Sequence, residues 1–79
     1  MEVRAYLADR AALAFEATAI RRSLQYNEGA DFTEDEIEAA LAFLAGLDPA
    51  QARAIQEDLG ATKRYQITSA GVLAHERRN

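Results

Sequence analysis

The sequence predicts one mainly helical α+β domain spanning residues 1–79. Three observations support this prediction. Residues 3–26 contain neither Gly nor Pro and are rich in Ala, the strongest helix former. The segment Thr33–Leu47 opens with a helix-capping pattern and continues with apolar residues at helical spacing. Residues 63–68, KRYQIT, alternate between polar and apolar side chains, which indicates a half-buried strand.

Chain length and composition limit the class of protein. A domain this short buries only about 60–65% of the surface of its unfolded chain, so its core must be efficient or a partner must help. The absence of Cys excludes disulfides, thiolate zinc sites and cysteine nucleophiles. The longest nearly apolar run, Ala39–Leu47, is far shorter than the roughly 20 residues that a membrane-spanning helix needs. We therefore expect a soluble, cytoplasmic protein without a signal peptide.

Charge is unevenly distributed along the chain, whose formal net charge is -4. Residues 1–26 carry four Arg against three acidic residues. Residues 27–60 carry nine acidic residues against one Arg, whereas residues 61–79 carry four cations against one Glu. The middle of the chain is thus strongly acidic and its last quarter is basic.

Two apolar stripes divide the helical segment 3–26. The phase changes near Phe15–Ala17, which favours two helices meeting there, although one long helix buried on two sides stays an alternative. The first stripe comprises Val3, Leu7, Ala11 and Ala14, and the second comprises Leu13, Ala17, Ile20 and Leu24.

The clearest local signal surrounds the start of the next helix. After a break at Asn27–Ala30, the side chain of Thr33 can bond the backbone of Glu36 while the Glu36 side chain reaches back to Thr33, which forms a capping box. Phe32 and Ile37 flank the box as a hydrophobic staple. Gly46 and Pro49 predict the end of this helix.

The remaining residues predict a hairpin and a closing helix. Residues 50–58 are ambiguous between helix and strand, and Gly60 is free to adopt a positive φ in the following turn. Thr68 or Ser69 can then cap a final helix with Val72 and Leu73 facing inward. Two cations in its last turn suit the helix dipole: Arg77 and Arg78.

The segment Arg64–Arg78, RYQITSAGVLAHERR, carries the most specific pattern. It resembles the Tyr-x-Leu/Ile-Thr-x-x-Gly ending that follows the wing in many bacterial winged-helix proteins. The order of predicted elements is also similar to the winged helix-turn-helix fold over most of the chain. The matching positions are Tyr65, Ile67, Thr68 and Gly71.

This resemblance implies a place for each element. Ala17–Gln25 would be the first helix of the helix-turn-helix unit, and Thr33–Ala45 would occupy the position of the recognition helix. Arg53–Asp58 and Lys63–Thr68 would form a small two-stranded wing, which explains a basic hairpin in an acidic chain. The resemblance also implies a DNA-binding role in transcription regulation.

A DNA-associated role is the interpretation that the sequence favours slightly. The basic wing would contact the phosphate backbone of duplex DNA without reading bases. The candidate nucleic-acid-binding residues are Lys63, Arg64, Arg21, Arg22, Arg77 and Arg78. However, the helix at the recognition position carries acids that DNA would repel, which argues against conventional docking of this helix in a groove. These acids are better explained as caps and a solvated face: Glu34, Asp35, Glu36 and Glu38.

The alternative is a protein-interaction or adaptor module that does not bind DNA. Two apolar sets exceed what a small core can hide, unless they complete that core: Ala39, Phe43 and Leu47, and Tyr6, Phe15 and Tyr26. The acids at residues 34–38 would suit a basic partner, and a homodimer is a further expectation.

No catalytic constellation is present in the sequence. His75 is the only histidine, and the acids at residues 34–38 lack the spacing of a calcium loop. No glycine-rich phosphate-binding loop occurs either. We therefore expect no enzyme activity, catalytic residue, cofactor, metal or small-molecule substrate.

Overall fold

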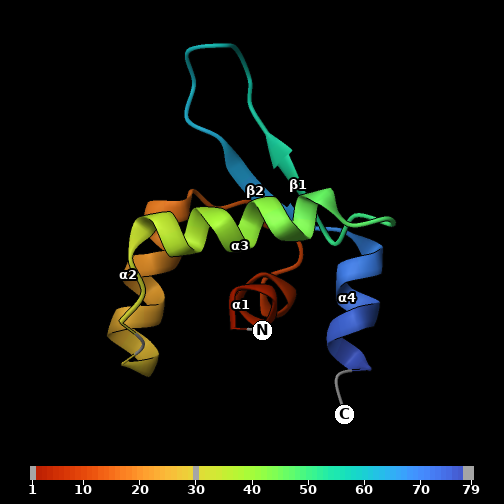
Figure 1. Cartoon of the computed structure of the whole chain (residues 1–79), viewed down its shortest axis with the longest axis horizontal. Helices are drawn as coiled ribbons and strands as arrows, with labels where there is room; N and C mark the ends of the chain where they lie inside the picture. Colours follow the sequence, from red (N-terminus) through yellow and green to blue (C-terminus); the bar gives the residue numbers. More distant parts are fainter. Residues whose placement is uncertain (1, 30, 78–79) are drawn as a thin grey trace.

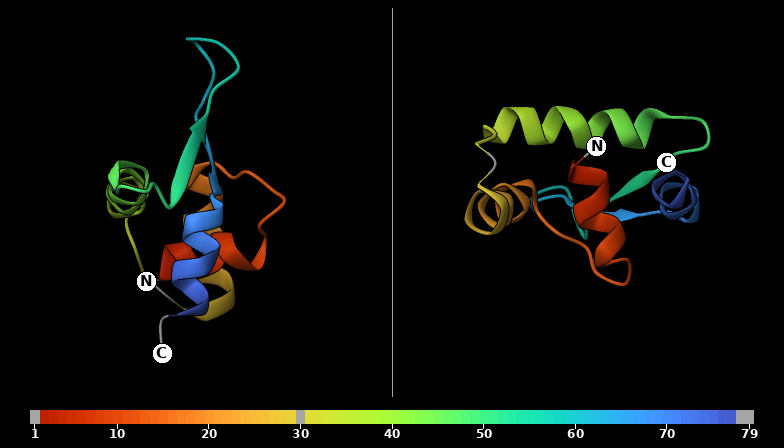
Figure 2. Two further views of the ribbon diagram at one scale, coloured as in Figure 1. Left: turned by 90° about the vertical axis from the view of Figure 1, so that its right-hand side faces the viewer. Right: turned by 90° about the horizontal axis from the view of Figure 1, so that it is seen from below.

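The computed structural model describes residues 2–29 and 31–77 (Figure 1). The described residues form a mainly helical α+β domain, as the sequence predicts. In chain order the elements are α1 (Glu2–Asp9), α2 (Ala17–Glu28), α3 (Glu34–Gly46), β1 (Ala52–Ile55), β2 (Arg64–Ile67) and α4 (Ser69–Glu76). Helix α3 crosses one side of the molecule, and the hairpin formed by β1 and β2 projects beyond the helices (Figures 1 and 2).

The first helical region consists of two helices, which confirms the preferred prediction. They do not meet at Phe15–Ala17, however, and the prediction of helix throughout 3–26 is wrong for residues 10–16. There Phe15 pairs with Tyr65 of β2 as an isolated antiparallel bridge, with N–O distances of 2.9 and 2.7 Å. Pairing with a distant strand therefore overrides the local helix propensity of this Ala-rich segment.

Aromatic contacts hold this connecting segment against α1. The rings of Tyr6 and Phe15 meet edge to face with their centroids 5.2 Å apart, and the Arg10 guanidinium lies 4.0 Å from the centre of the Tyr6 ring. The Tyr6 hydroxyl lies 3.1 Å from Ser23 Oγ and donates a hydrogen bond to it. One buried tyrosine thus links α1, the connecting segment and α2.

The capping box of α3 forms as predicted, whereas the predicted break at Asn27–Ala30 begins later, because α2 continues through Asn27 and Glu28. Gly29 ends α2 with φ of 66°, a left-handed conformation that glycine adopts without steric cost. The Glu36 amide donates to Thr33 Oγ1 over 3.1 Å, and the Thr33 amide donates to Glu36 Oε1 over 3.0 Å. Helix α3 ends at Gly46, as expected, and buries Ile37, Leu41 and Leu44.

The ambiguous segment 50–58 contains strand β1, which pairs antiparallel with β2. Ala52 lies opposite Ile67, and Ile55 lies opposite Arg64. Gly60 does not adopt the positive φ that its sequence position allows. Side chains shape the tip instead, because Gln56 Nε2 donates to the Ala61 carbonyl over 2.6 Å and the Gly60 amide donates to Asp58 Oδ1 over 2.9 Å.

Gln51 joins four elements at the base of the hairpin. Its amide donates to the Leu44 carbonyl of α3 over 2.9 Å, and its carbonyl accepts from the Thr68 amide over 3.1 Å. Its side-chain oxygen accepts from Arg4 of α1 over 3.1 Å. Gly71 of α4 lies directly against the Gln51 carbonyl.

Helix α4 begins as predicted but faces the core differently. Thr68 Oγ1 accepts from the Gly71 amide over 3.1 Å, so Thr68 is the N-cap. Val72 is half-buried against the core, whereas Leu73 is 45% exposed, so the expectation that Leu73 faces inward is wrong. Successive helical residues are rotated by about 100°, and burial of Gly71 turns Leu73 outward. Arg77 is the C-cap residue of α4, and Arg78 lies outside the described residues.

The core lies where the three N-terminal helices meet the base of the hairpin. Its largest fully buried side chains are Leu7, Ile20, Leu24, Ile37, Leu41 and Leu44. Helices α1, α2 and α3 each contribute to this set, and Ala52 and Ile67 add the hairpin base. Among the described residues, no helix has both the length and the apolar character needed to cross a membrane.

We predict that Gly71→Ala destabilises the fold. A Cβ at this position would overlap the Gln51 carbonyl and lie 2.5 Å from Ile67 Cγ1, and overpacking typically costs about 1–3 kcal/mol. Urea unfolding followed by circular dichroism would measure this loss. Gly46→Ala is the matched control, because a Cβ there meets nothing within 4 Å and Ala favours helix. Equal stability of both variants would contradict the assigned packing of α4.

We predict that Thr33→Ala lowers the free energy of unfolding by about 1 kcal/mol, because it removes the N-cap acceptor of α3. The same unfolding assay would detect the change. Thr62→Ala in the exposed hairpin tip provides the control and should alter stability by less than about 0.5 kcal/mol. A Thr33 variant as stable as this control would argue against the capping box.

Candidate functional site

Five of the six cations proposed from the sequence lie in the described residues, and these five do not gather on one surface. Lys63 and Arg64 belong to the hairpin, and Arg21 and Arg22 lie on α2. The hairpin tip and the C-terminal end of α4, where Arg77 lies, are at opposite ends of the molecule (Figures 1 and 2). The described residues therefore separate Arg77 from the wing cations, and Arg78 lies outside them.

On the hairpin, one cation is paired and another is not. Arg64 Nη2 lies 2.9 Å from Glu57 Oε1, with the two side chains 46% and 74% exposed. A pair this exposed contributes only about 0–1 kcal/mol. Lys63 is exposed and has no ion-pair partner among the described residues.

Arg53 is a hairpin cation that the candidate list omitted. Its strand register places it opposite Gln66, and its Nη2 donates to Gln66 Oε1 over 3.1 Å. Because side chains alternate along a strand, Arg53 and Ile55 share a face with Gln66 and Arg64. The alternating pattern of residues 52–55 could have predicted a strand and hence the position of Arg53. The sequence of this segment was, however, ambiguous between helix and strand.

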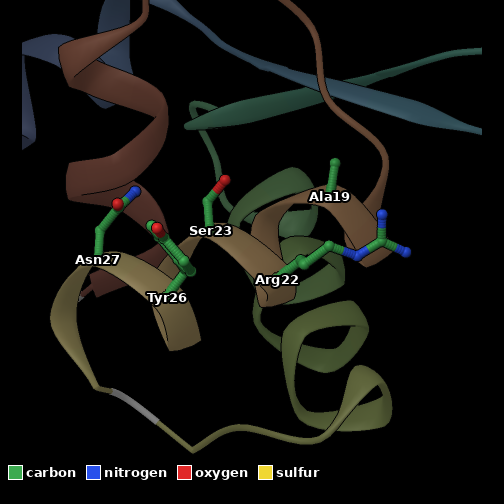
Figure 3. Close-up of a pocket in the computed structure, with 5 residues that line it drawn as sticks. All are labelled: Ala19, Arg22, Ser23, Tyr26 and Asn27. Carbon is green, nitrogen blue, oxygen red and sulfur yellow. The ribbon is translucent and has the colours of Figure 1, made fainter.

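The cations of α2 have different surroundings. Arg21 is half-buried and its Nη1 donates to Gln25 Oε1 over 3.4 Å, one helical turn away. Arg22 is exposed and lines an open hollow of about 400 Å³ on α2. Figure 3 shows its side chain on one side of Ser23, with Tyr26 and Asn27 on the other. Ala19 completes the lining.

The outward face of α3 is acidic in its first half. Glu34 Oε1 accepts from Thr18 Oγ1 over 2.9 Å, and Glu36 takes part in the capping box. Asp35 and Glu38 are exposed and have no ion-pair partner in the described residues. The helix contains no Lys or Arg.

The same face is apolar in its second half. Ala39, Ala42 and Phe43 are exposed, and the Phe43 side chain retains 57% of its accessible surface. We define the α3 face as Asp35, Glu38, Ala39, Ala42 and Phe43. Carboxylates thus lie beside an unburied aromatic ring on one helix.

The other apolar candidates divide between core and surface. Tyr6 is buried, while Phe15 and Leu47 pack against the core. Tyr26 is 89% exposed and borders the α2 hollow. Sequence reasoning missed Leu59, which is 98% exposed at the hairpin tip. Its position in a turn, between Asp58 and Gly60, could have indicated that this leucine is exposed.

The described residues bring together no metal-binding chemistry. No group of three or more His, Cys, Asp or Glu side chains in residues 2–29 and 31–77 could hold a metal ion. His75 lies half-buried on α4.

Comparisons with known proteins were made at three levels. Neither the protein-family models, the curated proteins nor the solved structures provide a match to this chain.

Proposed function

We propose that this chain is a protein-binding module of the winged-helix type, and that the α3 face is its interface. The order of α1, α2, α3, hairpin and α4 supports the winged-helix assignment. The bridge between Phe15 and Tyr65 adds a third strand-like segment beside β2, and the hairpin follows α3 as a wing would. The Tyr65, Ile67, Thr68 and Gly71 pattern supports the same assignment.

The charge of the α3 face carries the functional proposal. Duplex DNA presents about one negative charge per 1.7 Å of helix axis. A recognition helix in its groove would bring Asp35 and Glu38 close to phosphates without any cation of its own to compensate. Electrostatics therefore favour a protein partner for this face over DNA.

The chemistry of the α3 face specifies the partner. Asp35 and Glu38 would attract cationic side chains, and Phe43 would enter an apolar pocket next to them. The partner is therefore a protein whose contacting surface places Lys or Arg beside an apolar depression. Aromatic side chains at the centre of an interface commonly supply a large share of its binding energy.

We predict that a photo-crosslinking amino acid at Ala42 captures this partner in native cells. With the purified partner, Phe43→Ser and Glu38→Lys should each weaken binding about tenfold or more, because one removes the aromatic anchor and the other reverses a charge. Isothermal titration calorimetry would measure the affinities.

Leu13→Ser is the matched control for Phe43→Ser, because both side chains are 57% exposed. Leu13 lies in the segment between α1 and α2, and the right view of Figure 2 shows this segment on the side of the domain away from α3. Wild-type affinity in both α3 variants would refute the α3 interface.

Phosphate binding by the wing is the second candidate function. It is favoured by the exposed, unpaired Lys63 and by Arg53 and Arg64 on a shared strand face. Such contacts would position the hairpin on DNA without specifying a sequence.

We predict little or no binding to mixed-sequence duplex DNA, because the net charge is -4 and the α3 face is acidic. Fluorescence anisotropy at about 50 mM and about 200 mM salt would test this, since phosphate-driven binding weakens steeply between those conditions. Micromolar binding at the lower salt that disappears in a Lys63→Glu, Arg64→Glu double variant would establish the wing as a DNA contact instead.

A further inference from the structure

Leu59 is an apolar side chain held fully in solvent. It is 98% exposed at the tip of the hairpin. The tip is ordered by its own hydrogen bonds, in which the Ala61 amide donates to the Asp58 carbonyl over 3.1 Å and Gln56 donates to the Ala61 carbonyl over 2.6 Å. An ordered loop loses little conformational entropy on binding, so this tip is prepared for insertion into a partner.

The hollow on α2 has a size and a lining that suit an apolar side chain such as that of Leu59. It is open to solvent and has a volume of about 400 Å³, which is large enough for one leucine side chain. Ala19 and the ring of Tyr26 provide apolar surface, and Arg22 places a cation at its edge (Figure 3).

The charges beside Leu59 complement those beside the hollow. Asp58 directly precedes Leu59 in the tip, whereas Arg22 lines the hollow. Glu57, the other acid beside Leu59, already pairs with Arg64 over 2.9 Å. Asp58 uses Oδ1 to accept from the Gly60 amide, so its second carboxylate oxygen is available to a cation.

The tip cannot fill the hollow of its own chain. The hairpin tip and the C-terminal half of α2 lie on opposite sides of the domain in both Figure 1 and the left view of Figure 2. We propose that two copies of this chain associate through insertion of Leu59 from one copy into the α2 hollow of the other. Each copy carries both parts, so a two-fold dimer forms both contacts at once.

This association is independent of the α3 face. It uses the hairpin tip and α2, and it leaves Asp35, Glu38 and Phe43 accessible. A dimer would therefore present two α3 faces to protein partners.

Cysteine pairing tests the contact directly, because the chain contains no Cys of its own. An equimolar mixture of Leu59→Cys and Ala19→Cys variants should form a mixed disulfide under mild oxidation, since bridging requires Cβ atoms about 3.5–4.5 Å apart. The matched control pairs Leu59→Cys with Leu13→Cys, which is exposed but lies outside the hollow. Mixed-disulfide formation at least about tenfold faster with Ala19→Cys is expected; equal rates would overturn the proposal.

Sedimentation velocity supplies the second measurement. The wild-type chain should pass from monomer to dimer between about 1 µM and about 1 mM, the range of weak interfaces. Leu59→Ser and Arg22→Glu should each weaken dimerisation about tenfold or more, whereas Phe43→Ser should leave it unchanged. A monomer throughout this range, or a dimer that depends on Phe43 and not on Leu59, would overturn the proposal.

Discussion

The pairing of Phe15 with Tyr65 is the contact on which the arrangement of this domain depends. Two backbone hydrogen bonds join a connecting segment near the N-terminus to a strand fifty residues later in the chain. Tyr6 then packs its ring against Phe15 and its hydroxyl against Ser23, so α1 and α2 are positioned from the same point. The bridge belongs to a non-helical connection at residues 10–16, where local propensity alone favours a helix.

The sequence was most informative where structure is decided locally. The Thr33–Glu36 capping box and the Thr68 cap depend on neighbours within a few positions, and both are present as expected. The alternation of residues 63–68 also indicated the strand that forms at Arg64–Ile67, although the strand that pairs with it is β1. The connecting segment could not be predicted, because its partner strand is distant in sequence. The sequence also could not predict which cations lie close together. Periodicity shows which side chains share a face of one helix or strand, but it does not show which faces of different elements lie side by side. The exposure of Leu59 could not be predicted, because a leucine in a turn is buried only if other parts of the chain pack against it.

Charge separation gives the two ends of the molecule different chemical characters. Carboxylates and Phe43 occupy the outward side of α3, while the unpaired Lys63 belongs to the projecting hairpin. An acidic protein can therefore carry a basic element, because the opposing charges lie largely on separate elements. In the part of the chain that the structure describes, one ion pair joins a cation to an acid, and it lies within the hairpin: Arg64 with Glu57. In a chain this small, the elements that enclose the core must also provide the surface. Helix α3 does both, because one of its sides packs into the core and the opposite side is exposed.

Gln51 has a consequence for how such a domain can diversify. Its backbone and side chain fasten the hairpin base to α3, to α1 and to the start of α4, all before the first residue of β1. Residues 56–63 lie outside these attachments and contribute no side chain to the buried core. Changes in the length or composition of the tip would therefore alter the surface that the hairpin presents to a partner without altering the fold. The base of the hairpin is thus a fixed support, and the tip is the part of the hairpin that can vary.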